Sequence, residues 1–106
     1  METPLEVDVT TAANQLRAGA LLLDVREPHE VAICAIGGSR RIPMQQIPGQ
    51  LAALPRDRLI LVHCHHGGRS LRVTQYLRAQ GFTQVSNVAG GIDAWAESID
   101  PALARY

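Results

Sequence analysis

Short apolar runs alternate with segments of helical character along the whole chain. The strand-like runs lie at residues 5–9, 21–25, 58–63 and 83–88, with a brief one that ends at Pro43. The helix-like segments between them lie at residues 10–19, 26–33, 45–54, 70–81 and 90–99. This alternation favours a parallel sheet covered by helices over a sandwich of sheets or a bundle of helices.

Local signals set the predicted ends of three helices. The first helix starts with a Thr that can cap it and stops at Gly19. Gly81 is placed as the C-cap of the helix at 70–81. Pro48 interrupts the segment at 45–54 near its start, so we expect that helix to be broken early.

The size and the charge of the chain limit what it can be. With 106 residues, the stretch 1–106 forms a single domain with one core. Its 10 Lys and Arg balance its 10 Asp and Glu, so no bulk positive field attracts nucleic acid or an acidic membrane surface. We therefore expect neither nucleic acid nor a membrane among its partners.

The N-terminal stretch and the cysteines indicate a cytoplasmic protein. The stretch METPLEVDVTT carries acidic residues and lacks the basic flank and long apolar core of a signal peptide. No apolar run approaches the roughly 20 residues that cross a bilayer. Cys34 and Cys64 are too few for a disulfide framework, and a reducing cytosol keeps both as thiols.

The stretch LVHCHHGGRSLRV places Cys64 between a predicted strand and a predicted helix. In a parallel sheet this position lies at the edge where ligands bind. If the helix begins near Arg69 or Ser70, N–H groups of its first turn and of Gly67 and Gly68 converge on one point and can cradle an anion. The helix dipole and Arg69 would lower the pKa of the thiol, which makes Cys64 a candidate nucleophile.

Two other interpretations of Cys64 were weighed. A free cysteine is often a small buried hydrophobic residue. The HCHH stretch also suggests zinc, but residues so close in sequence rarely all face one ion, and no second Cys/His pair is present. We therefore expect no metal.

At this point the sequence resembles the rhodanese-like domains, and specifically the small single-domain thiosulfate sulfurtransferases. Four motifs carry the resemblance in order: LLLDVREPHE at 21–30, RIP at 41–43, CHHGGRS at 64–70 and GGIDAW at 90–95. The resemblance implies an α/β rhodanese-like fold, with a central five-stranded parallel sheet and helices on both faces.

The resemblance also implies a chemistry. Cys64 would take a sulfane sulfur from a donor such as thiosulfate and hold it as a persulfide until an acceptor removes it. The implied acceptors are cyanide or a thiol, including thioredoxin, glutathione or another protein. No metal or organic cofactor is implied. The residues expected to bind the anionic substrate are those of the loop: His65, His66, Gly67, Gly68, Arg69 and Ser70.

The length of the loop separates sulfur transfer from related reactions. Four residues lie between Cys64 and Arg69, whereas dual-specificity phosphatases resemble this pattern with five. A phosphate needs the wider cradle, so phosphatase or arsenate-reductase activity is a weaker alternative. A different alternative is a relay or docking module that accepts sulfur from a protein partner.

The match departs from the family before Pro43. The family commonly shows Gly-His-Ile-Pro-Gly-Ala where this chain has CAIGGS, so Cys34 and Ala35 replace Gly and His. This change leaves the loop intact but puts substrate choice in doubt. Cys34 is either a resolving thiol for the Cys64 persulfide or a plain buried or surface cysteine.

The remaining polar residues have two interpretations each. His65 and His66 either supply positive potential and proton transfer or contribute only their N–H groups. Asp24 and Arg26 either draw anions to the sheet edge or form a salt bridge that pins the loops.

Two further histidines and the closing motif are expected to be structural. For His63 and His29 we expect packing or turn hydrogen bonds. For Trp95, preceded by Gly90 and Gly91, we expect core packing after a tight turn.

Overall fold

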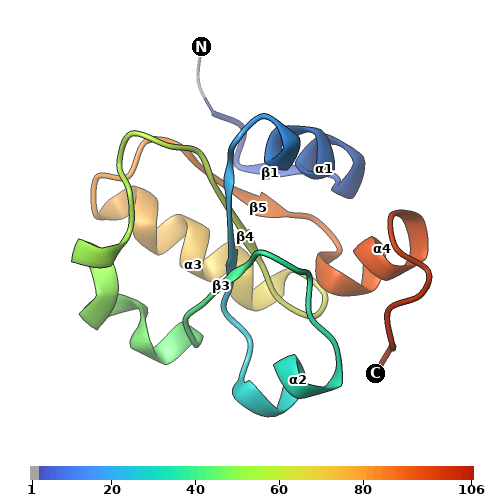
Figure 1. Ribbon diagram of the computed structural model, residues 1–106. Helices are drawn as coiled ribbons and strands as arrows, with labels where there is room; N and C mark the ends of the chain where they lie inside the picture. Colours follow the sequence, from blue (N-terminus) through green and yellow to red (C-terminus); the bar gives the residue numbers. More distant parts are fainter. Residues whose placement is uncertain (1–2) are drawn as a thin grey trace.

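The computed structural model describes residues 3–106 and contains one sheet of five strands (Figure 1). The strands are β1 (Glu6–Val7), β2 (Leu21–Asp24), β3 (Arg40–Arg41), β4 (Ile60–His63) and β5 (Val85–Val88). Their order across the sheet is β1-β5-β4-β2-β3. Every pairing is parallel, which confirms the predicted α/β class with a central five-stranded parallel sheet.

Helices cover both faces of the sheet, as the sequence predicted. They are α1 (Val9–Arg17), α2 (Pro28–Ile33), the 3-10 helix η1 (Met44–Ala53), α3 (Gly68–Ala79) and α4 (Gly91–Ser98). In Figure 1, α1 and α4 lie on one side of the strands, and α3 and η1 lie on the other. The short α2 belongs to the connection from β2 to β3.

Side chains of the central strands alternate between two hydrophobic clusters. In β4, Ile60 and Val62 pack under α3 and η1, whereas Leu61 packs under α1 and α4. In β2, Leu23 and Leu22 divide in the same way. Both faces of these strands are therefore buried, as a parallel sheet between two helical layers requires.

The start of the chain differs from the prediction. Of the strand expected at 5–9, only β1 forms. Because Asp8 caps the first helix, α1 begins at Val9, the last residue of the expected strand. The Asp8 carboxylate accepts a hydrogen bond from the Thr11 N–H at 2.8 Å, so Asp8 and not a Thr satisfies the first turn. Gly19, with φ of 109°, follows the helix where a stop was predicted.

Two other helices also differ from the prediction. The segment at 45–54 forms a 3-10 helix with Pro48 inside it, because a proline offers no N–H to an α-helical ladder. Helix α3 begins at Gly68, earlier than expected, and its C-cap is Gln80, with Gly81 one position beyond. Among residues 3–106 no helix has both the length and the apolar character needed to cross a membrane.

Candidate active site

Cys64 follows β4 directly, and a short loop leads from it into α3. This places the thiol at the carboxyl end of a central parallel strand, as predicted. Gly67 is the N-cap residue of α3 and has φ of 106°, a left-handed conformation that favours glycine. A Cβ there would also lie 3.2 Å from the backbone nitrogen of Gly90. Glycine at this position therefore allows the sharp turn from strand to helix.

Three donors surround the sulfur of Cys64. The Gly67 N–H donates to Sγ at 3.1 Å, the Ser70 N–H at 3.5 Å and the Ser70 hydroxyl at 3.4 Å. Burial of the thiol opposes its ionisation, but these bonds and the backbone N–H of Arg69 outweigh burial and hold the pKa of Cys64 below its ordinary value. The cradle of N–H groups predicted from the sequence is present, and the buried Ser70 hydroxyl adds to it.

The other side of the loop is held by the start of α4. The N–H of Ile92 donates to the Cys64 carbonyl at 2.9 Å, and the N–H of Asp93 donates to the His65 carbonyl at 3.1 Å. A Cβ at Gly91 would collide with both of these carbonyl oxygens. The closing motif thus does more than make the predicted tight turn, because its glycine lets α4 approach and hold the loop backbone. Trp95, 8% exposed, packs in the core as expected.

The guanidinium of Arg69 is bound by a carboxylate. Its Nη1 and Nη2 each lie 2.7 Å from an oxygen of Glu30. This contact lowers the pKa of Glu30 to about 2 and raises the pKa of Arg69. The backbone N–H of Arg69 helps to lower the pKa of the thiol, and its charge interacts favourably with that of the Cys64 thiolate, as expected. The side chain remains 33% exposed beside the loop.

Arg26 forms a buried salt bridge with Asp24. Its Nη2 lies 2.8 Å from Asp24 Oδ2, and its Nε lies 3.0 Å from Oδ1. Arg26 also donates to the carbonyls of Glu30 at 3.3 Å and Cys34 at 2.8 Å, and to the Tyr106 hydroxyl at 3.1 Å. Because Arg26 is 1% exposed, it pins the surrounding loops, which was one of its two predicted roles. Attraction of anions by this side chain is not supported.

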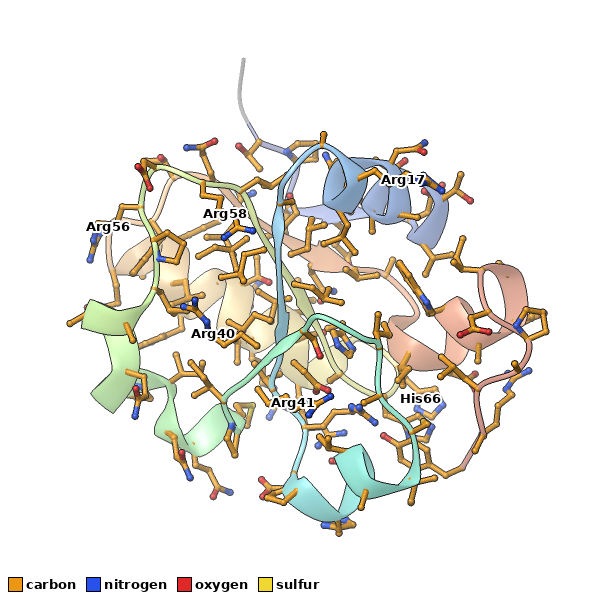
Figure 2. All side chains as sticks on the ribbon, in the orientation of Figure 1. Arg17, Arg40, Arg41, Arg56, Arg58 and His66 are labelled. Carbon is orange, nitrogen blue, oxygen red and sulfur yellow. The ribbon has the colours of Figure 1, made fainter. Side chains whose placement is uncertain are left out.

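His65 and His66 belong to an aromatic stack beside the loop. The ring centroid of His65 lies 3.8 Å from those of His66 and Tyr106, and His66 is exposed (Figure 2). Ligand atoms of both histidines and of Asp93 lie within 4.8 Å of one another, a spacing that could hold a metal ion. Asp93, however, already pairs with Arg105 at 2.8 Å. Stacking and this ion pair account for all three side chains without a metal.

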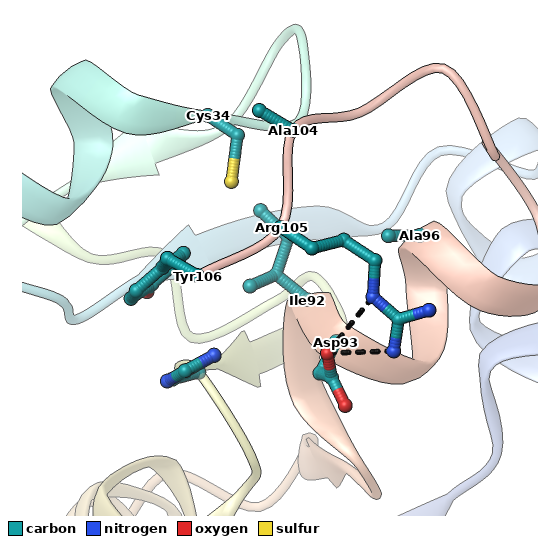
Figure 3. Close-up of a pocket in the computed structure, with 8 residues that line it drawn as sticks. Cys34, Ile92, Asp93, Ala96, Ala104, Arg105 and Tyr106 are labelled. Carbon is teal, nitrogen blue, oxygen red and sulfur yellow. Dashed lines mark hydrogen bonds and ion pairs between the residues drawn. The ribbon is translucent and has the colours of Figure 1, made fainter.

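Cys34 is a free, half-buried thiol in a hollow lined also by His65, Ile92 and Tyr106 (Figure 3). It packs against the cluster under α1 and α4, whereas Cys64 belongs to the cluster on the other face of the sheet. Both cysteines are free thiols, and the resolving role of Cys34 stays a prediction.

His63 is buried, which confirms packing, one of the two roles expected for it. Within residues 3–106 neither ring nitrogen has a hydrogen-bond partner, and its Nε2 lies 3.7 Å from Asp24 Oδ2. Burial lowers the pKa of His63 to about 4, so the ring packs in its neutral form. His29 is exposed on α2, so packing, one of the two roles expected for it, is wrong.

Sequence reasoning missed two side chains that organise the site. Glu30 binds Arg69, and the Tyr106 hydroxyl donates to Glu30 at 3.1 Å. Glu30 also closes a capping box with Glu27 at the start of α2; that spacing in the sequence was a usable signal. For Tyr106 the sequence offers no comparable signal, because its contacts depend on the path of the C-terminal segment.

The parallel α/β sheet presents a buried thiol with a lowered pKa inside a glycine-rich loop, a setting typical of proteins with a nucleophilic cysteine. The model of the rhodanese-like domain family matches residues 8–98. The chain therefore belongs to the rhodanese-like domain family, as its motifs indicated.

Relatives of similar length agree with this assignment. A sulfurtransferase of Allochromatium vinosum is 36% identical over 93% of this chain and 94% of its own length. The thiosulfate sulfurtransferase GlpE of Stutzerimonas stutzeri is 38% identical over 74% of this chain and 72% of its own. A rhodanese-like domain protein of Staphylococcus aureus superposes with a TM-score of 0.80 at 30% identity, over 100% and 99% of the two chains. The chain is therefore a rhodanese-family sulfurtransferase.

Proposed function

We propose that the protein transfers sulfane sulfur from thiosulfate to a thiophilic acceptor through a persulfide on Cys64. The observation that carries this proposal is the set of donors around Cys64 Sγ, at 3.1 to 3.5 Å. These donors stabilise a thiolate inside a loop that is otherwise dry, since Cys64 is 2% exposed. Thiosulfate as the donor is suggested by the name of the GlpE relative.

In the first step the Cys64 thiolate attacks the sulfane sulfur of thiosulfate. A sulfur–sulfur bond forms to Cys64 Sγ while the bond to the sulfonate sulfur breaks, and its electron pair leaves with sulfite. The negative charge of the thiolate moves to the terminal sulfur of the Cys64 persulfide. The N–H groups of the loop and of the first turn of α3 stabilise this charge.

In the second step an acceptor nucleophile attacks the terminal sulfur. Cyanide leaves as thiocyanate and a thiolate leaves as a persulfide, and in both cases Cys64 recovers its electron pair as a thiolate. The reaction is a two-step displacement that consumes no oxidant or reductant. We place this reaction in the cytoplasm because both cysteines are free thiols and a reducing cytosol keeps thiols in that form.

The exposed residues of the Cys64 loop are the ones that we expect to contact the substrate. His66 and Gly68 are exposed and Arg69 is partly so, which leaves these residues available to the sulfonate of thiosulfate. The guanidinium of Arg69, oriented by Glu30, is the fixed positive charge nearest in sequence to Cys64. In this proposal the Arg69 guanidinium binds the donor in addition to favouring the thiolate of Cys64.

Intact-mass spectrometry under non-reducing conditions tests the proposal. The protein is measured before and after thiosulfate, together with Cys64→Ser and, as a matched control, Cys34→Ser. We expect the parent and Cys34→Ser to gain the mass of one sulfur atom, and cyanide to remove it as thiocyanate. An adduct that persists in Cys64→Ser contradicts the role of Cys64.

The same experiment separates the weaker alternatives. A protein that takes no sulfur from thiosulfate but gains it from a persulfidated protein donor is a relay module. Hydrolysis of a phosphate ester that depends on Cys64 would indicate phosphatase chemistry, which the loop of four intervening residues disfavours.

A further inference from the structure

Asn87 is a fully buried polar residue in the sheet beside the site. It lies in β5, where it pairs in register with Glu6 of β1 and Val62 of β4. Its exposed fraction is 0%, and Val85 and Val88 of the same strand are core residues. The sulfur-transfer scheme above assigns it no part.

The two hydrogen bonds of Asn87 fix the orientation of its amide. Its Nδ2 donates to Glu6 Oε2 at 2.8 Å and to the Gly67 carbonyl at 3.1 Å. Both partners are acceptors, so the NH₂ group must face them. The amide oxygen is consequently buried without a hydrogen-bond partner among residues 3–106. A side chain chosen only to fill this position could be apolar and avoid that unpaired oxygen.

The bond to Gly67 bears directly on the geometry at the thiol. The two backbone groups of Gly67 serve different partners: its N–H donates to Cys64 Sγ at 3.1 Å, and its carbonyl accepts from Asn87 and from the Leu71 N–H at 3.0 Å. Gly67 has φ of 106°, in a region that glycine leaves and enters freely. The bond from Asn87 adds a contact from outside α3 to the helical bond from Leu71 in holding one orientation of this residue.

We propose that Asn87 is a positioning residue for the Cys64 loop, which holds the Gly67 carbonyl so that the Gly67 N–H faces the sulfur. The inference rests on the proposed function in one respect: the N–H groups that Asn87 helps to position stabilise the Cys64 thiolate and the persulfide proposed to form on it. The link runs through the backbone of one residue. Removal of the amide weakens a donor to Cys64 while leaving Cys64, Arg69 and Ser70 unchanged.

The test is the pH dependence of the alkylation of Cys64 by iodoacetamide. It is measured in a Cys34→Ser background, so that one thiol reacts, and it needs no sulfur donor. The variants are Asn87→Ala and Asn87→Leu, the second of which keeps the number and branching of the side-chain heavy atoms. The matched control is Glu6→Ala, which removes the other partner of the Asn87 amide and leaves the bond to Gly67.

We expect the Asn87 variants to alkylate about three- to tenfold more slowly than the parent below the pKa of the thiol. Their rates at high pH should equal that of the parent, because the thiolate itself is intact. Glu6→Ala should follow the parent at all pH values. Thermal unfolding by circular dichroism checks that each variant is folded.

Three results overturn the proposal. One is a folded Asn87 variant with the pH profile of the parent, and another is an equal slowing in Glu6→Ala. If neither Asn87 variant folds, the proposal is tested by NMR on the parent protein. It requires a coupling through the hydrogen bond between Asn87 Nδ2 and the Gly67 carbonyl carbon. The absence of this coupling is the third result that overturns the proposal. If the Asn87 variants show the expected shift of the alkylation profile but the parent takes up no sulfur from thiosulfate, the role of Asn87 is supported and thiosulfate is rejected as the donor.

Discussion

Glu30 and Arg69, 39 positions apart in the sequence, form a two-point ion pair in which each guanidinium nitrogen lies 2.7 Å from a carboxylate oxygen. The pair joins the start of α2 to the start of α3. It orients an arginine beside the thiol and occupies part of its hydrogen-bonding capacity. The chemistry of the loop therefore depends on an acidic residue in a different motif.

Glu30→Gln should weaken the fold at neutral pH and matter less in acid. Because the pKa of Glu30 is lowered from 4.5 to about 2, its ion pair stabilises the protein above pH 4.5, and this contribution is lost as the pH falls towards 2. We expect a loss of about 2 kcal/mol at pH 7, reduced from the full shift because Arg69 is partly exposed. Urea unfolding at pH 7 and pH 3 measures it. The exposed Glu97→Gln is the control, and an equal loss at both pH values contradicts the prediction.

Ser70→Ala should raise the pKa of Cys64. The Ser70 hydroxyl lies 3.4 Å from Sγ and helps to lower the pKa of Cys64, so its loss removes a hydrogen bond that stabilises the thiolate. Alkylation below the thiol pKa should slow by up to about tenfold. Thr74→Val is the matched control, because it removes a buried hydroxyl one turn along α3 that bonds to the Ser70 carbonyl. If both variants slow the reaction equally, the hydroxyl of Ser70 has no specific role.

Gly91→Ala should destabilise the protein and disturb the loop. Its Cβ would collide with the carbonyl oxygens of Cys64 and His65, and φ at this residue is 58°. We expect a loss of about 2 kcal/mol or more together with slower alkylation of Cys64. Gly49→Ala, with open space around it and no positive φ, should be nearly neutral in thermal unfolding. A Gly91→Ala protein as stable as Gly49→Ala would refute the contact.

His63→Leu should remove a pH dependence of stability. The pKa of His63 is lowered to about 4 from 6.5, so the unfolded chain binds a proton that the folded chain refuses between these values, and stability falls as the pH drops through this window. Leucine avoids both the proton and the two unpaired ring nitrogens. We expect unchanged or higher stability at pH 7 and a flatter profile from pH 6.5 to 4, measured by urea unfolding. Retention of the parental slope would show that other groups, such as Asp24, carry it.

The loop around Cys64 could be predicted because its determinants are local. A strand, two glycines and a helix start lie within a few residues, and backbone N–H groups act whatever the side chains do. The sheet was predictable for a similar reason, since apolar runs such as that of β4 report burial on both faces. The lowered pKa of Cys64 follows from these elements.

The partners of the loop could not be predicted because they come from distant segments. Tyr106 reaches Glu30 across 76 positions and Asn87 reaches Gly67 across 20. Arg69 looked free in the sequence, and only the fold brings a carboxylate to it. The start of α1 shows that prediction is limited at short range too. Asp8 and the nearby threonines can each cap a helix, and packing decides which of them does so.

The two outer strands of the sheet are its shortest. β1 and β3 contain two residues each, and both residues of β3 are exposed arginines. An edge of this kind offers a neighbouring molecule only a brief run of unpaired backbone groups, lined with like charges. Concentrated samples should therefore resist strand-to-strand aggregation, even though the central strands are rich in buried apolar residues.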